Sequence, residues 1–219
     1  RNDTPRVGLT QLLDCRPMPL RAGIIGTGRI GSTLELDAFR HKPHTHAGWY
    51  VSNPHILLKA GSDTNPNRLA AFGAAWGIRE PHLYLDYQDM LEREALDLVS
   101  VCAYAPERIA MAEAAIEAGA SGLWLEKAVG CSVAEARRLL ARARAQGVSV
   151  VVNHPRSQDG GYREVRRLIE AGDLGPLESV HVLFSGHLLH TGTHAWEVLD
   201  AWCGPWAEVR CWPGGAAAR

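Results

Sequence analysis

The chain has 219 residues, of which 46% are hydrophobic and 21% are charged, a composition typical of globular proteins with an apolar core. Its 23 Lys and Arg residues nearly balance 24 Asp and Glu residues, which leaves a net charge of −1 at pH 7. This balance argues against nucleic-acid proteins and polybasic membrane binders, because both need a surplus of basic residues. No apolar run reaches the roughly 18 residues of a membrane span, and the N-terminus does not resemble a signal peptide. We therefore expect a cytoplasmic protein whose five widely spaced cysteines are reduced.

A glycine-rich turn with the spacing G-x-G-x-x-G follows the first predicted strand, at 22–25. The turn consists of Gly26, Thr27, Gly28, Arg29, Ile30 and Gly31. Between a strand and a helix, the first glycine permits the tight turn and the second lets the backbone approach a pyrophosphate. The third glycine lets the helix pack against the strand, and the helix N-terminus offers N–H groups to the phosphates. This setting favours nucleotide binding over a structural glycine turn.

Asp63 closes the second predicted strand, at 55–61. A carboxylate there accepts hydrogen bonds from the ribose hydroxyls of an adenosine and repels a 2′-phosphate. Asp63 lies 63 − 31 = 32 positions after the last glycine, against about 20 expected. We attribute the excess to an insertion at 41–54, whose three histidines we interpret as parts of a polar loop. The alternative role of Asp63 is to cap the next helix or turn.

Strands and helices alternate up to residue 152. A short third strand is expected to begin at Tyr84. Three more strands are expected at 98–103, 122–126 and 148–152. One helix is expected directly after the glycine turn, with inward residues Ile30, Leu34 and Phe39, and the others at 68–76, 87–94, 106–119 and 132–147. Because the strands are continuous apolar runs, the sequence predicts an α/β fold of the Rossmann type, a doubly wound parallel sheet with helices on both faces.

The pattern changes after residue 152, where we expect a helix at 162–171, a strand at 177–183 and a helix at 195–202. We therefore divide the chain into an N-terminal extension, 1–20, a dinucleotide-binding domain, 21–152, and a partial α+β substrate or oligomerisation domain, 153–219. Tryptophans cluster near the end, and for Trp202 and Trp206 the sequence favours packing in a core or interface over stacking on a sugar ring.

Lys127 follows Glu126 at the end of the fifth predicted strand. Open α/β sheets bind ligands at this edge. A lysine partly removed from water there has a lowered pKa and can exchange protons near neutral pH. A solvated lysine paired with Glu126 is the alternative.

His190 and His194 are four residues apart, so they share one face if a helix begins before His194. Acid–base catalysis by a histidine is favoured over purely structural histidines. A metal site that adds His187 or Glu197 is the third alternative, but no third ligand is compelling and we predict no metal.

Together these segments resemble the Gfo/Idh/MocA family of nicotinamide-dependent oxidoreductases, over roughly 21–205. Residues 23–31 are similar to the family's opening strand and turn, and 125–128 (Leu-Glu-Lys-Ala) to its Glu-Lys-Pro signature. Residues 153–154 and 171–175 resemble the entry to its second domain, and 192–204 its active-site helix. The family's second domain is longer, so this chain resembles a member truncated in that domain.

The resemblance implies NAD(P)-dependent hydride transfer between nicotinamide and a sugar, cyclitol or related polyol. Lys127 and His194 would be the catalytic pair, with His190 as the third catalytic position. The cofactor would lie against the glycine turn, Asp63, Ala103, Tyr104, Glu126 and Lys127. Asp63 favours NAD, and the nearby Arg68 leaves NADP open. The alternative is a catalytically inactive dinucleotide-binding or interaction protein derived from the family. The sequence also leaves open whether the chain forms a homo-oligomer.

Four positions depart from the family pattern. Ala128 replaces the signature proline, and His190 stands where many members have aspartate. Ala103-Tyr104 replaces Thr-Pro, and Arg108 stands where histidine is common. These departures concern the loops that present the predicted catalytic groups, so they bear on which substrate is bound.

Overall fold

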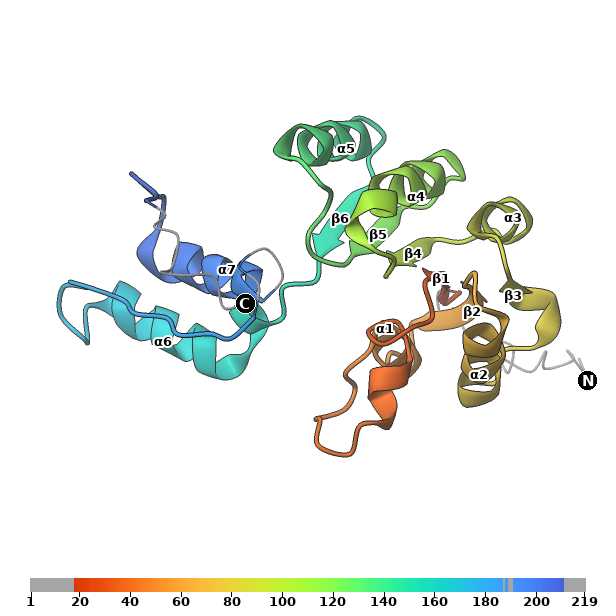
Figure 1. The fold of residues 1–219 in the computed structure, drawn as a ribbon, viewed down its shortest axis with the longest axis horizontal. Helices are drawn as coiled ribbons and strands as arrows, with labels where there is room; N and C mark the ends of the chain where they lie inside the picture. The colour runs from red at the N-terminus through yellow and green to blue at the C-terminus, as the bar shows by residue number, and fades with distance from the viewer. Residues whose placement is uncertain (1–17, 187, 189–190, 211–219) are drawn as a thin grey trace, which may run out of the picture. The chain divides into compact units, whose positions relative to one another are not determined.

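The fold comes from a computed structural model, which describes residues 18–186, 188 and 191–210. Six strands form one sheet in the order β3-β2-β1-β4-β5-β6 (Figure 1). They are β1 (Leu20–Ile25), β2 (Ile56–Ser62), β3 (Leu83–Tyr84), β4 (Leu98–Val101), β5 (Gly122–Leu125) and β6 (Ser149–Val152). The pairs β1–β2, β2–β3 and β5–β6 are parallel. The predicted α/β fold of the Rossmann type is confirmed.

Seven α-helices connect or follow the strands in the described part of the chain. They are α1 (His46–Ser52), α2 (Pro66–Trp76), α3 (Tyr87–Arg93), α4 (Ala105–Glu117), α5 (Val133–Ala145), α6 (Gly160–Ala171) and α7 (Gly192–Cys203). Short 3-10 turns add η1 (Thr33–Leu36), η2 (Glu80–His82) and η3 (Arg156–Gln158). None of the helices in these residues is both long and apolar enough to cross a membrane.

The chain divides into two compact units. The first runs through Ser100 and includes 118–120, and the second contains 101–117 and the residues from 121 on. The predicted domain boundaries at 20 and 152 divide the chain by the expected role of each part, not by compactness. They stay predictions.

In the first unit, α1 and α2 lie on one side of β1 and β2, and α3 lies on the other (Figure 1). The apolar strand residues meet these helices, which leaves Ile24, Phe72 and Met90 almost without solvent contact. A Cβ at Gly61 would lie 2.3 Å from Phe72 Cε1, so this glycine in β2 allows the close approach of α2. Burial of this apolar surface is the main force that holds the helices on the sheet.

The helix expected directly after the glycine turn is wrong. Only the short turn η1 forms there, and Phe39, expected to face inward, is fully exposed. The helix that packs on the sheet is α1, inside the segment interpreted as an insertion, and Thr45 caps it by accepting a hydrogen bond from Gly48 N. The residues that lengthen the distance between Gly31 and Asp63 therefore lie before α1. His46, expected in a polar loop, is buried with Nδ1 2.9 Å from Ser100 Oγ.

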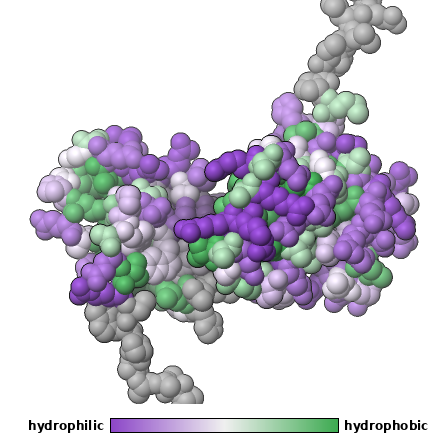
Figure 2. Space-filling view, turned by 90° about the horizontal axis from the view of Figure 1, so that it is seen from above, coloured by the Kyte–Doolittle hydropathy of each residue, from purple (hydrophilic) through white to green (hydrophobic). Residues whose placement is uncertain are grey.

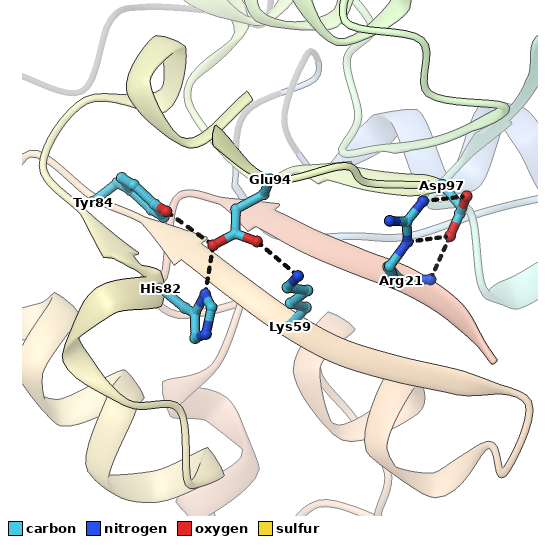
Figure 3. Close-up of polar contacts among 6 residues, drawn as sticks. All are labelled: Arg21, Lys59, His82, Tyr84, Glu94 and Asp97. Carbon is cyan, nitrogen blue, oxygen red and sulfur yellow. Dashed lines mark hydrogen bonds and ion pairs between the residues drawn. The ribbon is translucent and has the colours of Figure 1, made fainter. Parts of the chain in front are cut away.

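Glu94, at the end of α3, carries a buried carboxylate that joins three elements of the first unit (Figure 3). It contacts His82 Nδ1 at 2.5 Å, accepts a hydrogen bond from Tyr84 Oη at 2.8 Å and pairs with Lys59 Nζ at 3.1 Å. Burial alone would raise the pKa of Glu94, but these partners outweigh it and the pKa is lowered. The cluster ties α3 to β2 and β3. At the start of β1, Arg21 similarly donates to Asp97 through its backbone and guanidinium nitrogens.

In the second unit, α4 and α5 lie on the same side of β5 and β6 (Figure 1). Ser132 and Glu135 form the predicted capping box at the start of α5. The strand expected at 148–152 forms as β6, which is the edge strand of the sheet in the described residues, and Val151 is 59% exposed.

The C-terminal part of the second unit contains α6 and α7. Trp202 donates a hydrogen bond from Nε1 to Tyr162 O and stacks on the Tyr162 ring, which holds the two helices together. The strand expected at 177–183 is wrong: this segment is irregular, and the described residues provide no neighbouring strand for its backbone. Figure 2 shows hydrophobic residues at the surface among hydrophilic ones. In the irregular segment, Leu177, Val182 and Leu183 are exposed.

Candidate functional site

The glycine turn of the first unit has the geometry of a phosphate-binding loop. Gly26 has a φ of 90°, which favours glycine, and its N–H donates to Ser62 O at 2.8 Å. A Cβ at Gly31 would lie 2.2 Å from Gly26 O, so only glycine closes the turn. The N–H groups of His46 and Ala47 donate to the carbonyls of Ile30 and Gly31, which places the N-terminus of α1 directly against the turn.

The middle of the turn leaves room for a ligand. A Cβ at Gly28 would meet only Arg68 Nη1, at 3.9 Å, and Arg29 is exposed. Among the backbone hydrogen bonds of the described loops, none has the N–H of Gly28, Arg29 or Ile30 as donor. Free N–H groups around an open glycine are what a pyrophosphate requires, so these residues fit a dinucleotide.

Asp63 lies beside this turn. Its Oδ2 accepts hydrogen bonds from Thr27 N at 3.0 Å and from Thr27 Oγ1 at 3.2 Å, and its Oδ1 accepts from Asn65 N at 2.9 Å. Asn65, and not Asp63, caps α2. A carboxylate offers about four acceptor positions, so Asp63 keeps capacity for a ribose hydroxyl while it holds the turn.

The loops after β4 and β5 meet at Arg108 of α4, in the second unit. Ala103 O accepts a hydrogen bond from Arg108 Nη2 at 2.5 Å, and Ala128 O accepts one from Nη1. Burial lowers the pKa of Arg108, and Glu126 opposes this effect. Tyr104, predicted to contact the cofactor, is 83% exposed. Arg108 thus fastens the loop that carries Lys127.

Glu126 and Lys127 follow β5, as predicted. Glu126 is buried, donates through its N–H to Val101 O and accepts a hydrogen bond from Asn153 Nδ2 at 2.5 Å. Burial lowers the pKa of Lys127, and the negative charge of Glu126 only partly offsets this effect. Lys127 is therefore closer to proton exchange at neutral pH than an exposed lysine.

Two histidine rings, those of His154 and His194, lie 5.6 Å apart in an edge-on arrangement. Burial, with the positive charges of Arg156 and Lys127, lowers the pKa of His194 from 6.5 to about 4. Burial also lowers the pKa of His154. Both rings are therefore neutral at pH 7, and the buried Nδ1 of each has no hydrogen-bond partner.

The sequence predicted a catalytic role for His194 and none for His154. The signal for His154 was its position just after β6, at the same kind of strand end as Lys127. His190 and His187 lie outside the described residues. Within the described part of the chain, no group of three or more His, Cys, Asp or Glu residues is placed to hold a metal ion.

Comparison with known proteins agrees with this geometry. The model of the Gfo/Idh/MocA family, described as an oxidoreductase family with an NAD-binding Rossmann fold, matches residues 20–154. The chain belongs to this family. The match covers the glycine turn, Asp63, Lys127 and His154.

Relatives in the family include dehydrogenases of cyclitols and sugars. Inositol 2-dehydrogenase 3 of Saccharopolyspora erythraea is 30% identical over 72% of this chain and 43% of its own. D-apiose dehydrogenase of Paraburkholderia graminis is 30% identical over 63% of this chain and 35% of its own. The chain thus spans less than half the length of these relatives.

Solved structures share the fold. An oxidoreductase from Pseudomonas syringae superposes with a TM-score of 0.70, 26% identity and coverage of 85% of this chain and 53% of its own. A scyllo-inositol dehydrogenase from Lactobacillus casei, solved with NAD(H) and scyllo-inositol, gives a TM-score of 0.69 at 19% identity over 84% of this chain and 56% of its own.

Proposed function

We propose that this chain forms the cofactor-binding and proton-transfer part of an NAD(P)-dependent oxidoreductase that acts on a sugar, cyclitol or related polyol. The observation that carries this proposal is the cluster of Lys127, His154 and His194, whose pKa values are all lowered. The open glycine turn beside Asp63 supports the cofactor part. The names of the family's relatives support the substrate class.

In this proposal the residues of the chain bind and move protons. The nicotinamide, when bound, supplies or accepts the hydride. His194, neutral at pH 7, accepts the proton of the substrate hydroxyl during oxidation and returns it during reduction. Lys127 donates a hydrogen bond to the same oxygen. The neighbouring Glu126 accepts a hydrogen bond from Asn153 Nδ2. Asp63 receives the adenosine ribose, which favours NAD over NADP because a carboxylate repels a 2′-phosphate.

Turnover by the full chain tests the proposal. NADH formation is measured with NAD⁺ and a panel that includes myo-inositol, scyllo-inositol and glucose. We expect oxidation of at least one compound, and a loss of about 10²–10⁴-fold in kcat in Lys127→Met and His194→Asn, the range for removal of a general acid or base. NADH binding should persist in His194→Asn, since His194 is not among the residues predicted to contact the cofactor.

His55→Asn is the matched control, because His55 is exposed in the first unit and outside the cluster. NADH binding without oxidation of any compound in the panel would contradict the proposal and favour a dinucleotide-binding protein without catalysis.

A further inference from the structure

A cavity open to solvent lies beside His154, in the second unit. Its volume is about 340 Å³, within the range of small-molecule sites. The cavity is lined by His154, Thr193, Trp196, Glu197, Asp200 and Trp206. Lys127 and His194 are not among the residues that line it.

One face of α7 forms the floor of this cavity. Thr193, Trp196, Glu197 and Asp200 are spaced at i, i+3, i+4 and i+7, so they share one side of the helix. Trp206, from the segment after α7, completes the wall with its ring 5.0 Å from that of Trp196 and at 63° to it. Trp206 is 44% exposed, so a large part of its surface stays open to a ligand. The sequence favoured packing in a core or interface over stacking on a sugar ring for Trp206, and that expectation stays a prediction.

Polar atoms at the cavity lack partners. Glu197 Oε2 and His154 Nδ1 are both buried and make no hydrogen bond. These two atoms are enclosed by protein, but their side chains line the cavity. A hydroxyl group of a ligand suits both side chains, because it donates to a carboxylate and either donates to or accepts from an imidazole nitrogen.

The charges restrict the class of ligand. Glu197 and Asp200 are both acidic, and an anionic group such as a phosphate or a uronate would be repelled by them. Flat indole surfaces favour a compact ring with an apolar face. An uncharged, hydroxyl-rich sugar ring satisfies both requirements.

We infer that this cavity is a subsite for an uncharged sugar ring joined to the polyol that reacts, so that the chain binds a glycoside more tightly than the free cyclitols and monosaccharides of the proposed function. The inference rests on the proposed function, which places the reacting hydroxyl at Lys127 and His194. His154 links the two places, because it lines the cavity and its ring lies 5.6 Å from that of His194.

Binding to the full chain, without turnover, tests the subsite. Saturation-transfer NMR and calorimetric titration are carried out with cellobiose, maltose and lactose, and with glucose and myo-inositol as single-ring probes. We expect at least one disaccharide to bind about tenfold more tightly than glucose, and Trp206→Ala to lower that affinity by about tenfold. Asp200→Asn should also weaken it, and this variant keeps the test valid if Trp206→Ala misfolds, because Asp200 is exposed.

Trp49→Ala is the matched control, an exposed tryptophan of the first unit that should leave disaccharide binding unchanged. The subsite is wrong if no disaccharide binds more tightly than glucose, or if Asp200→Asn and Trp206→Ala bind like the control. Oxidation of cyclitols without disaccharide binding would overturn the subsite and leave the proposed function. Disaccharide binding through Trp206 without oxidation of any polyol would support the subsite and contradict the proposed function.

Discussion

His194 shows how burial prepares a side chain for chemistry. Removal from water and two nearby cations lower its pKa to about 4, so the imidazole is a proton acceptor throughout the neutral range. The sequence pointed to Lys127, His194 and Asp63 as candidates because each stands at a strand end or in a helix of a recognisable pattern. His154 also follows a strand end, but its contact with the His194 ring, like the contacts of Arg108 with two loop carbonyls, is tertiary. No spacing in the sequence reports such contacts.

The lowered pKa of His194 also predicts a pH dependence of stability. Between pH 6.5 and about 4 the unfolded chain binds the proton of this histidine and the folded chain does not. The free energy of unfolding should therefore fall as the pH is lowered through this window, and His194→Gln should make the fall shallower. Urea titrations at a series of pH values measure both slopes. Equal slopes for the two proteins would show that His194 titrates normally in the folded state.

Among the elements, those with strong local signals were predicted well. α2 has Asn65 as its cap, Pro66 in its first turn and Gly77 with a φ of 69° after its end. α1 was missed because it is short and follows an irregular stretch, so its apolar residues show no long helical period. The strand expected at 177–183 needs a hydrogen-bonded neighbour, and sequence alternation does not reveal whether one is present.

The Glu94 cluster is an element-scale contact with a measurable contribution to stability. Glu94→Ala would leave Tyr84 Oη without its acceptor and remove the counter-charge of Lys59. We expect a loss of about 2 kcal/mol in the free energy of unfolding, measured by urea titration at pH 7. Glu92→Ala, on the exposed side of the same helix, is the control and should stay within about 0.5 kcal/mol of the parent. Equal effects of the two substitutions would show that the cluster does not stabilise the fold.

On the scale of the whole molecule, each compact unit contributes one part of the proposed activity. The glycine turn and Asp63 belong to the first unit, and Lys127, His154 and His194 belong to the second. The alternation of apolar strands and helices predicted the fold of both. The family match over residues 20–154 agrees with that fold and includes both sets of residues except His194.

The most direct test of the account is NADH binding by the full chain and by Gly28→Val, followed by NADH fluorescence. A Cβ at Gly28 meets only the end of the flexible Arg68 side chain, so the fold should accept the substitution while the pyrophosphate is blocked. Gly160→Val is the matched control, because a Cβ there meets nothing within 4 Å. We predict saturable binding by the parent and the control, and a Kd at least about tenfold higher for Gly28→Val. Equal NADH binding by Gly28→Val and the parent would contradict the proposed cofactor site.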